Sequence, residues 1–471
     1  MKKTRIIATI GPASSSELVL TKLIKAGVNV VRLNFSHGDH KSHRDLVELV
    51  REVAKKLNTT VAILQDLPGP KIRIGDFYKE RVNLKKGSLF VLTTKKCMGD
   101  EGIVHVNYKS LPKEVKKGDF ILLDDGKKKL KVLGASKTDI KCRVMIGGET
   151  KGRRGLNIPG AYLKISSLTK KDREHLDFGI KHNIDFVALS FVRKASDILE
   201  LKEILKKNKS EAEVIAKIET KEAIDNLDEI IEETDAVMVA RGDLAVEVPA
   251  ENVPLFQKKI VKKCNELGKP VVVATQMLES MIRSPIPTRA EVSDVANSIL
   301  DGADAVMLSE ETALGEYPLE AVSMMNSVAE KIEENYPRVS FVKHDVCELL
   351  PKGIVDSVSS SVVNTAYEVG AKAIIALTES GFTARMISRY KPAQPIIVMT
   401  PNLKTANKIV LSFACRPVVI KPFKYVANVM DQVRKFVLKE KYAKKGDKVV
   451  IVAGVPFGQR GGTNMLMVEV I

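Results

Sequence analysis

Short, nearly unbroken apolar runs recur along the first two thirds of the chain, and most of them end on a polar side chain. Uninterrupted runs rich in Val, Ile and Ala are typical of strands buried on both faces of a parallel sheet. Helical periodicity fills most of the intervals, as at residues 16–25, 42–56, 196–207 and 253–267. The eight runs are Arg5–Ile10, Val30–Phe35, Val61–Asp66, Phe186–Ser190, Val214–Glu219, Ala236–Arg241, Pro270–Thr275 and Ala305–Ser309.

Eight strands that alternate with helices predict a closed (β/α)8 barrel. An open, doubly wound parallel sheet is the alternative, because it is built from the same strand–helix units. Sheets of that kind that bind dinucleotides carry G-x-G-x-x-G after the first strand, and no such motif follows Ile10. The pattern therefore favours the barrel.

The segment from Lys71 to Ser166 interrupts this alternation. Its β-like runs are short, at 81–84, 88–93, 120–123 and 128–132, and turns rich in Gly, Asp and Lys separate them. This pattern of short runs and turns predicts a small all-β domain inserted after the third barrel strand. Pro68, Gly69 and Pro70 come just before it and predict a hinge between the two domains.

Alternating helices and strands resume near residue 339. Strands are expected at 373–378, 395–399, 417–420, 448–453 and 465–471, with helices between most of them. The patterning as a whole predicts an α/β protein with three parts. These are a (β/α)8 TIM barrel (1–70 and 167–338), an inserted small β-barrel lid (71–166) and a C-terminal α/β domain of regulatory type (339–471).

Composition indicates a cytoplasmic protein. The chain is 44% hydrophobic but lacks a long apolar run, so it can bury large cores and is not expected to cross or contact a membrane. Its five cysteines are scattered, odd in number and never in C-x-x-C spacing. That usage is typical of a reducing compartment and indicates neither a zinc site nor a disulfide framework.

The formal charge of +17 allows three interpretations. A solvated basic surface is the simplest, and attraction of anionic substrates is the second. Nucleic-acid binding is the third, but the chain has no Trp, aromatic residues make up only 5%, and no RNP or zinc-finger motif is present. We therefore expect no nucleic-acid partner.

Polar side chains gather where the predicted barrel strands end. The carboxyl ends of the strands form the active-site face of such a barrel, so these side chains are expected to share one mouth. One charge at a strand end is ordinarily a solvated cap or half of an ion pair, but this many indicate a functional site, since burying unmatched charge is costly. They are Arg32, Asn34, Asp66, Lys217, Glu219, Arg241, Asp243, Thr275, Ser309 and Glu311.

The residue types at this mouth indicate metal-assisted phosphate chemistry. Glu219 and Asp243 offer hard oxygen atoms with no His or Cys nearby, which suits Mg²⁺ held by carboxylates and substrate oxygens. Arg32, Arg73 and Lys217 are cations of the kind that bind phosphate oxygens. No G-x-x-x-x-G-K-[ST] loop is present, so we predict phosphoryl transfer outside the P-loop class.

Six longer segments carry a more specific signal. They are Ile10–Ala13 (IGPA), Val31–Gly38 (VRLNFSHG), Ile215–Glu219 (IAKIE), Val239–Leu244 (VARGDL), Ala274–Ser280 (ATQMLES) and Met307–Thr312 (MLSEET). In content, order and spacing they resemble the pyruvate kinase family, and the resemblance extends over nearly the whole chain. The family's order of domains is also the order predicted above.

The resemblance implies transfer of the phosphoryl group of phosphoenolpyruvate to ADP, giving pyruvate and ATP in the last step of glycolysis. By position, Glu219 and Asp243 resemble the ligands of Mg²⁺ (or Mn²⁺). Lys217 resembles the group that faces the transferring phosphoryl and the developing enolate oxygen, while Arg32 and Arg73 resemble phosphate binders.

The remaining positions at the mouth are similar to groups that hold substrate or move a proton. The backbone N–H groups of Gly242 and Asp243, together with Thr275, resemble the clamp on the substrate carboxylate. Thr275, Ser309 and Glu311 are similar to a relay that works through water to protonate enolpyruvate at carbon.

Nucleotide contacts are implied on both sides of the predicted cleft. Pro12 and His37 fall where the family contacts nucleotide, although a strand-cap hydrogen bond is an equal interpretation of His37. The lid positions that match residues closing over the site are Asp125, Arg154 and Asn157. Lid closure would exclude water and strengthen the electrostatic interactions inside.

Asp66 and Lys71 raise the question of monovalent cations. Members of the family that need K⁺ bind it with residues matching Asn34, Ser36, Asp66 and the Leu67 carbonyl, and they resemble one another in carrying Glu at the Lys71 position. Members that do not need K⁺ carry Lys there, usually with Leu at the Leu67 position, and this chain has both. A tethered ammonium is expected to supply the charge of K⁺, so K⁺ should not be required.

One segment of the C-terminal domain resembles an effector site. Residues 378–383 (TESGFT) lie between a predicted strand and a predicted helix, where backbone N–H groups can bind phosphate, and Thr378, Ser380, Gly381 and Thr383 are the candidate contacts. A helix-capping turn without a ligand is an equal interpretation. Glu379 argues against a bisphosphate, while a sugar monophosphate or AMP remains an option. The resemblance also implies a homotetramer.

Two other functions stay open at this stage. The first is another metal-enolate barrel enzyme acting on phosphoenolpyruvate, and the predicted lid together with Arg32, Lys217, Glu219 and Asp243 argues against it. The second is a non-catalytic, nucleic-acid-binding relative. Its signature would be a nucleic-acid affinity that falls steeply with salt.

Overall fold

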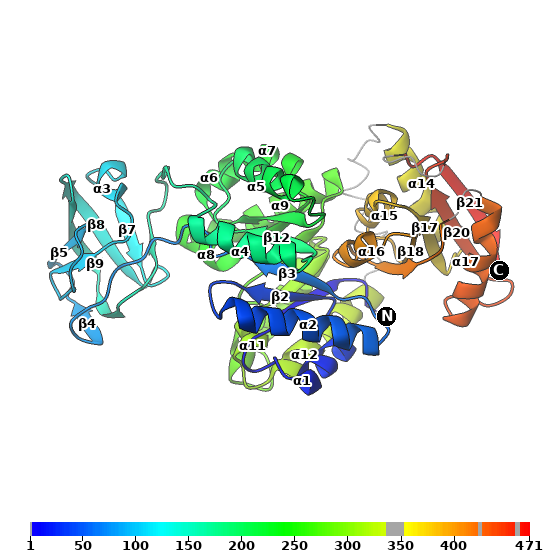
Figure 1. The fold of residues 1–471 in the computed structure, drawn as a ribbon, viewed down its shortest axis with the longest axis horizontal. Coiled ribbons are helices and arrows are strands. Elements are labelled where there is room, and N and C mark those ends of the chain that lie inside the picture. The colour runs from blue at the N-terminus through cyan, green and yellow to red at the C-terminus, as the bar shows by residue number, and fades with distance from the viewer. Residues whose placement is uncertain (1, 336–352, 423–425, 457–461) are drawn as a thin grey trace.

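The structure is a computed structural model of the 471-residue chain, and it describes residues 2–335, 353–422, 426–456 and 462–471. Three bodies follow one another along its longest axis (Figure 1). The insert stands at one end, the barrel lies in the middle and the C-terminal domain lies at the other end. The predicted fold is confirmed. The domain limits stay predictions, and the one at 338/339 lies outside the described residues.

Eight parallel strands close the barrel in the order β1-β16-β15-β14-β13-β12-β3-β2. All of them are apolar runs found in the sequence, shortened by one or two residues at the ends in most cases. Their bounds are Arg5–Thr9 (β1), Val30–Asn34 (β2), Ala62–Asp66 (β3), Phe186–Leu189 (β12), Glu213–Ile218 (β13), Ala236–Ala240 (β14), Val271–Ala274 (β15) and Ala305–Leu308 (β16).

Helices surround this barrel (Figure 1). Several begin with a side-chain cap, such as Asp39, whose carboxylate accepts from Ser42 N at 2.8 Å at the start of α2. The helices are α1 Glu17–Ala26, α2 His40–Lys56, α4 Lys170–Lys181, α5 Ala195–Lys207, α6 Lys221–Asp225, α7 Leu227–Glu233, α8 Arg241–Glu247, η1 Ala250–Asn252, α9 Val253–Leu267, η2 Glu279–Ile282, α10 Arg289–Leu300, α11 Glu310–Ala313 and α12 Pro318–Asn335. No helix in the described part of the chain is long and apolar enough to span a bilayer.

The insert is built from antiparallel pairs, with one parallel pair between β5 and β6. Six strands in the order β11-β7-β8-β9-β5-β6 curl into a half-barrel around their own apolar core, and β10 pairs with β4 beside them. The elements are β4 Arg81–Leu84, β5 Leu89–Thr93, β6 Ile103–His105, α3 Leu111–Glu114, β7 Phe120–Leu123, β8 Lys128–Ala135, β9 Asp139–Ile146, β10 Gly148–Lys151 and β11 Leu156–Asn157.

Strand β9 was not among the predicted runs, although it is as long as any strand in the insert. Its sequence alternates Ile140, Cys142 and Val144, which are buried, with charged or exposed residues. One-sided strands alternate in this way because only one face meets the core, so the alternation over 139–146 was the available signal for β9.

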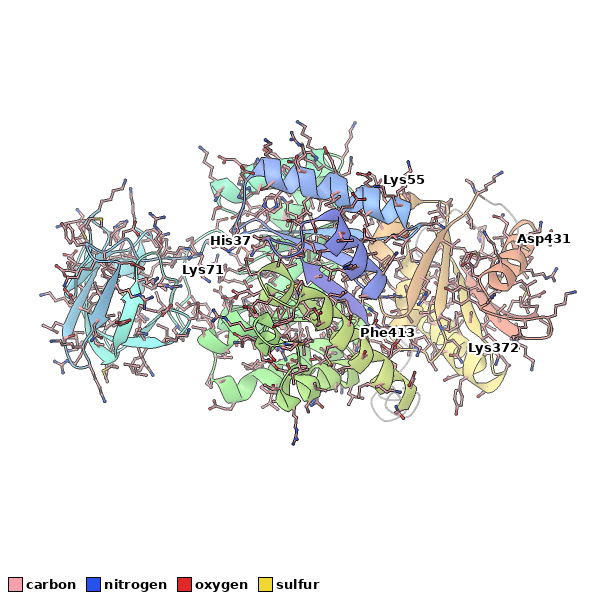
Figure 2. The ribbon with its side chains drawn as sticks, turned by 90° about the horizontal axis from the view of Figure 1, so that it is seen from below. His37, Lys55, Lys71, Lys372, Phe413 and Asp431 are labelled. Carbon is pink, nitrogen blue, oxygen red and sulfur yellow. The ribbon has the colours of Figure 1, made fainter. Side chains whose placement is uncertain are left out.

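The C-terminal domain is a five-stranded sheet in the order β19-β18-β17-β20-β21, parallel except for β21. Its elements are α14 Ile354–Glu368, β17 Ala373–Leu377, α15 Phe382–Ser388, β18 Ile396–Thr400, α16 Leu403–Ile409, β19 Cys415–Val419, α17 Val426–Lys439, β20 Lys448–Ala453 and β21 Met465–Val470. Val410 and Leu411 of this domain join the apolar cluster inside the barrel. Phe413 N donates to Asp304 Oδ1 at 2.9 Å, at the junction shown in Figure 2. The domain therefore packs against the amino ends of the barrel strands, opposite the mouth.

Candidate functional site

A buried cluster of charges lies at the carboxyl ends of β2, β3 and β13. Arg32 Nε donates to Asp66 Oδ2 at 2.7 Å, and Lys217 Nζ lies 3.3 Å from Asp66 Oδ1 and 2.8 Å from Glu219 Oε1. Strand pairing aligns Arg32 and Asn34 of β2 with Leu64 and Asp66 of β3, which brings residues distant in sequence to one level of the barrel. The predicted convergence of these side chains is therefore observed.

Burial and charge pairing act in opposite directions on this cluster. Desolvation opposes the ionisation of Asp66, but Lys217 and Arg32 outweigh it and hold the pKa of Asp66 below its usual range. Burial would also neutralise Lys217, yet Asp66 and Glu219 raise its pKa. The pKa of Glu219 is raised, chiefly by burial and also by the nearby charge of Asp243, against the opposing effect of Lys217. The cluster thus places the charged ammonium group of Lys217 beside Glu219, a carboxyl group that binds a proton more readily than usual.

Three partners of this cluster were missed by the sequence interpretation. Ser190 Oγ accepts from Lys217 Nζ at 2.7 Å, Thr9 Oγ1 accepts from Arg32 Nη1 at 2.8 Å, and Phe191 N donates to Glu219 Oε2 at 2.8 Å. Ser190 ends its apolar run just as Asp66 ends another. The hydroxyl groups of Thr9 and Ser190 at the strand ends were the available signal.

A second group of residues lies at the ends of β14, β15 and β16. Gly242 N donates to Thr275 Oγ1 at 2.8 Å at the start of α8. Thr275 has φ of +68°, which is strained for a β-branched residue and is a feature of functional sites. The Arg241 guanidinium donates two hydrogen bonds to the Asp294 carboxylate, of 2.6 and 2.7 Å. These bonds hold the first turn of α8 in place.

Glu311 is the buried acid of this group. Its two oxygens accept from Ser309 N at 2.7 Å and from Leu278 N at 3.2 Å. Burial raises the pKa of Glu311 in spite of these bonds. The predicted relay residues Ser309 and Glu311 are therefore in direct contact, through a backbone N–H.

Lys71 lies between the insert and the barrel, as Figure 2 shows. Its Nζ is 3.8 Å from Asp243 Oδ1, and among the described residues no ion pair joins it to Asp66. Asn34 Oδ1 accepts from Ser36 N at 3.1 Å, and Leu67 is fully buried. The prediction that Lys71 serves the monovalent-cation pocket stays a prediction, with Asp243 as its observed partner.

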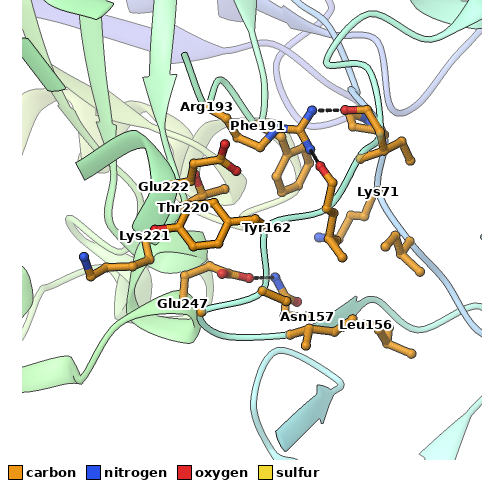
Figure 3. Close-up of a pocket in the computed structure, with 17 residues that line it drawn as sticks. Lys71, Leu156, Asn157, Tyr162, Phe191, Arg193, Thr220, Lys221, Glu222 and Glu247 are labelled. Carbon is orange, nitrogen blue, oxygen red and sulfur yellow. Dashed lines mark hydrogen bonds between the residues drawn. The ribbon is translucent and has the colours of Figure 1, made fainter. Parts of the chain in front are cut away.

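Individual side-chain contacts join the insert to the barrel. Asn157 Nδ2 donates to Glu247 Oε1 of α8 at 3.0 Å, across a cavity of about 70 Å³ drawn in Figure 3. Burial raises the pKa of Glu247, while the bond from Asn157 opposes the rise. Arg193 Nη1 of the barrel donates to Leu163 O at 3.1 Å and so holds the segment through which the chain returns from the insert to the barrel. Of the predicted lid residues Asp125, Arg154 and Asn157, only Asn157 forms a hydrogen bond to the barrel within the described part of the chain.

The other predicted nucleotide contacts are dispersed. Arg73 Nη1 donates to Arg153 O at 3.0 Å within the insert, and Arg154 Nε pairs with Asp124 at 3.3 Å, next to Asp125. Pro12 and His37 are exposed, and Figure 2 shows His37 on the side of the barrel that faces the insert. The structure does not bring these residues together, and their role stays a prediction.

The predicted effector loop precedes α15. Gly381 has φ of +80°, and its N–H donates to Thr378 Oγ1 at 3.1 Å, which is the geometry of a capping turn. The Thr383 hydroxyl is buried against that of Thr463 at 2.9 Å, so it faces the domain interior. Ser380 O accepts from Arg385 at 3.5 Å. An effector at this loop stays a prediction.

Comparison with known proteins gives one consistent result. Residues 1–322 match the family model "Pyruvate kinase, barrel domain", and residues 356–469 match "Pyruvate kinase, alpha/beta domain". The chain is 44% identical over 475 aligned positions to pyruvate kinases of Staphylococcus epidermidis and Staphylococcus aureus, covering 100% of this chain and 81% of each relative. A crystal structure of a pyruvate kinase from Cryptosporidium parvum superposes with a TM-score of 0.94 at 38% identity, covering 100% of this chain and 96% of that one.

Proposed function

The chain belongs to the pyruvate kinase family, and from that premise we propose which of its residues carry out the reaction and that the reaction does not depend on K⁺. It is a phosphotransferase, and its substrates are phosphoenolpyruvate and ADP. The observation that carries the proposal is the buried contact of Lys217 with both Asp66 and Glu219.

Lys217 is assigned to the transferring phosphoryl group. Its side chain is 11% exposed and its pKa is raised, so the ammonium stays charged at the bottom of the mouth. A charge held in place by Ser190, Asp66 and Glu219 needs no reorganisation when negative charge develops on the phosphoryl and enolate oxygens. Arg32, fixed by Asp66 and Thr9, supplies a second cation from the neighbouring strand.

Glu219 and Asp243 are assigned to the divalent metal that the family uses, here Mg²⁺. Both donors are carboxylates, and the charge of Asp243 contributes to the raised pKa of Glu219, so the pair favours a cation between them. The described chain contains no group of three or more His, Cys, Asp or Glu side chains fit for a metal. Two carboxylates suit Mg²⁺, which keeps water and substrate oxygens as its other ligands. The ion would neutralise charge on the transferring phosphoryl group.

Gly242, Thr275 and the Ser309–Glu311 pair are assigned to the carboxylate and the enolate carbon. The N–H of Gly242 and the hydroxyl of Thr275 already lie 2.8 Å apart, and a substrate carboxylate could accept from both groups after rotation of the hydroxyl. Glu311 is buried with a raised pKa, so it holds a proton at higher pH than an ordinary carboxyl. We infer that it feeds the proton relay through Ser309, Thr275 and water.

Lys71 is assigned the role that K⁺ plays in other family members. Its ammonium lies 3.8 Å from Asp243 and is tethered to the hinge, so positive charge is present at the mouth without recruitment of an ion. Activity should depend on Mg²⁺ and change little with K⁺. The Lys71→Glu variant should become K⁺-dependent.

The test is a coupled assay of pyruvate formation from phosphoenolpyruvate and ADP with Mg²⁺, run with K⁺ or with a tetramethylammonium salt at equal ionic strength. Absence of pyruvate with folded protein would contradict the catalytic assignment. Strong K⁺ activation of the natural chain, or an active Lys71→Glu enzyme that remains indifferent to K⁺, would contradict the role of Lys71. Lys79→Glu is the matched control, because Lys79 is an exposed lysine of the same insert, paired at 3.1 Å with Glu101.

A further inference from the structure

The insert carries the largest share of the excess positive charge of the chain, 13 against 10 for residues 339–471. Residues 71–166 contain 23 Lys and Arg against 10 Asp and Glu, whereas the barrel segments 1–70 and 167–338 contain 33 against 39. The reaction at the barrel mouth uses few of these cations. The excess therefore requires an explanation of its own.

Side-chain alternation sorts the insert cations onto one face of the curled sheet. On β8 the inward residues Leu130 and Val132 are buried, and on β9 the inward residues are Ile140, Cys142 and Val144. The side chains between them point outward. We call the outward side of β5, β7, β8 and β9 the outer face; its cations are Lys129, Lys131, Lys141 and Arg143.

The cations of the outer face are not neutralised within the protein. Lys131 and Arg143 are directly opposite on the antiparallel pair β8 and β9, an arrangement of like charges that destabilises a sheet. Among the described residues none of the four outer-face cations forms an ion pair with a carboxylate. The only acidic residue of these four strands is Asp139, which accepts from Thr93 Oγ1 at 2.6 Å. A partner with negative charge would relieve this repulsion.

Exposed apolar side chains share the outer face with the cations. Leu89 is 61% exposed, Ile146 51%, and Met145 and Phe120 each 37%. The ring of Phe120 has Lys129 Nζ 4.1 Å and Lys131 Nζ 6.0 Å from its centre, so lysine already covers it. The face thus offers cations and aliphatic groups together, with no aromatic ring open for base stacking.

Further lysines extend the positive charge in two dimensions. They lie in exposed turns at both ends of the four strands: Lys85, Lys86, Lys95, Lys96, Lys116, Lys117 and Lys137. Neighbouring strands lie about 4.8 Å apart and outward residues repeat about every 6.8 Å along a strand. The cations therefore cover an area instead of following one line.

We propose that the outer face of the insert docks on an anionic lipid surface. The headgroups of such a membrane present negative charge in a plane, each nearby Lys or Arg adds to the attraction, and the acyl boundary accepts aliphatic side chains such as Leu89 and Ile146. A single-stranded nucleic acid fits less well, because it needs a linear track and free rings for stacking. Figure 1 shows the insert at the end of the molecule remote from the C-terminal domain, where a flat surface can reach it.

This inference revises the expectation that the chain has no contact with a membrane. That expectation rested on the absence of an apolar run long enough to cross a bilayer. Peripheral docking needs no such run, since surface cations and a few aliphatic side chains suffice. The outer face carries none of the residues assigned to the reaction, so docking and catalysis are separable.

The test is co-sedimentation of the full chain with vesicles of phosphatidylcholine containing roughly one third phosphatidylserine at low ionic strength. We expect binding that is lost at high salt and absent with pure phosphatidylcholine. The triple variant Lys129→Glu/Lys131→Glu/Arg143→Glu should bind at least about ten-fold more weakly. The matched control, Lys22→Glu/Lys206→Glu/Lys439→Glu, changes the net charge equally at exposed lysines outside the insert and should bind as the natural chain does.

Three outcomes would overturn the proposal. They are no binding to anionic vesicles, an equal loss in both triple variants, and tight binding of a single-stranded oligonucleotide without vesicle binding. Pyruvate formation by each variant shows that it is folded. The single variant Arg143→Thr removes the like-charge pair, leaves the lysines over Phe120 in place and puts a strand-favouring residue in β9, so it should not lower the melting temperature while it weakens vesicle binding, a combination that unfolding cannot produce.

Discussion

Lysine and arginine side chains have opposite environments at the barrel mouth and in the insert. At the mouth, the side chains of Lys217 and Arg32 are each only 11% exposed and contact carboxylates or hydroxyls at 2.7–3.3 Å. In the insert, Lys131, Lys141 and Arg143 are exposed and lack ion pairs among the described residues. A buried charge must be matched because desolvation is costly, whereas an exposed charge is solvated and free to meet an external partner. Position in the fold, more than residue type, therefore decides what a cation does.

The largest effect is expected when the buried network loses its central cation. In Lys217→Met, the buried carboxyl groups of Asp66 and Glu219 lose the cation that contacts both of them, so unfolding should become easier by about 3–5 kcal/mol. Turnover should fall by at least about 10³-fold, because the charge facing the phosphoryl group is gone. Denaturant titration and the pyruvate assay measure both quantities. Lys206→Met, at an exposed barrel lysine, is the control, and comparable losses there would erase the contrast between buried and exposed cations.

The clamp at α8 should show a smaller, chemically selective effect. Thr275→Ala removes the hydroxyl that accepts from Gly242 N, and the loss of one such bond should lower kcat/KM roughly ten-fold. Thr275→Ser keeps the hydroxyl and removes a β-branch at φ of +68°, so it should stay active and be no less stable. Equal activity of the two variants would show that the hydroxyl is not used.

The contact between the two regions should be sensitive to pH. Burial raises the folded-state pKa of Glu247 above its unfolded value, so protonation stabilises the fold. That contribution is fully present below the unfolded pKa of about 4.3 and is lost as pH rises through the folded pKa. Glu247→Gln keeps an oxygen for Asn157 and does not titrate. Its stability advantage over the natural chain should therefore grow from pH 4 to pH 7 in thermal melts, and a difference that is constant with pH would contradict this account.

The smallest effect is expected for ion pairs on the insert surface. Arg81 and Glu149 lie 3.2 Å apart with both side chains more than half exposed. Arg81→Ala should change the unfolding free energy by at most about 1 kcal/mol, because water screens such pairs. Denaturant titration of Arg81→Ala and of Lys217→Met under the same conditions compares their two changes in unfolding free energy directly. A loss as large as that of Lys217→Met would mean that exposure does not set the strength of these pairs.

The apolar patterning was sufficient to predict the architecture. Eight Val- and Ile-rich runs correspond to the eight barrel strands, since strands buried on both faces must be apolar throughout. The same reasoning failed at β9, where one face meets solvent and charges interrupt the run. The strand ends also indicated most of the mouth residues, because parallel strands in a barrel all end on one face.

The tertiary structure decided which of these residues touch. Sequence could not show that Ser190 and Thr9 hold Lys217 and Arg32, that Lys71 lies beside Asp243, or that Asn157 reaches Glu247, because these contacts depend on strand register and on how the insert meets α8. Nor could it place Lys131 opposite Arg143, twelve positions away. The sequence by itself determined the elements and their chemistry, since burial and periodicity are local properties of the chain. Pairing between distant segments is a property of the packed fold, and it alone separated the cations of the mouth from those of the outer face.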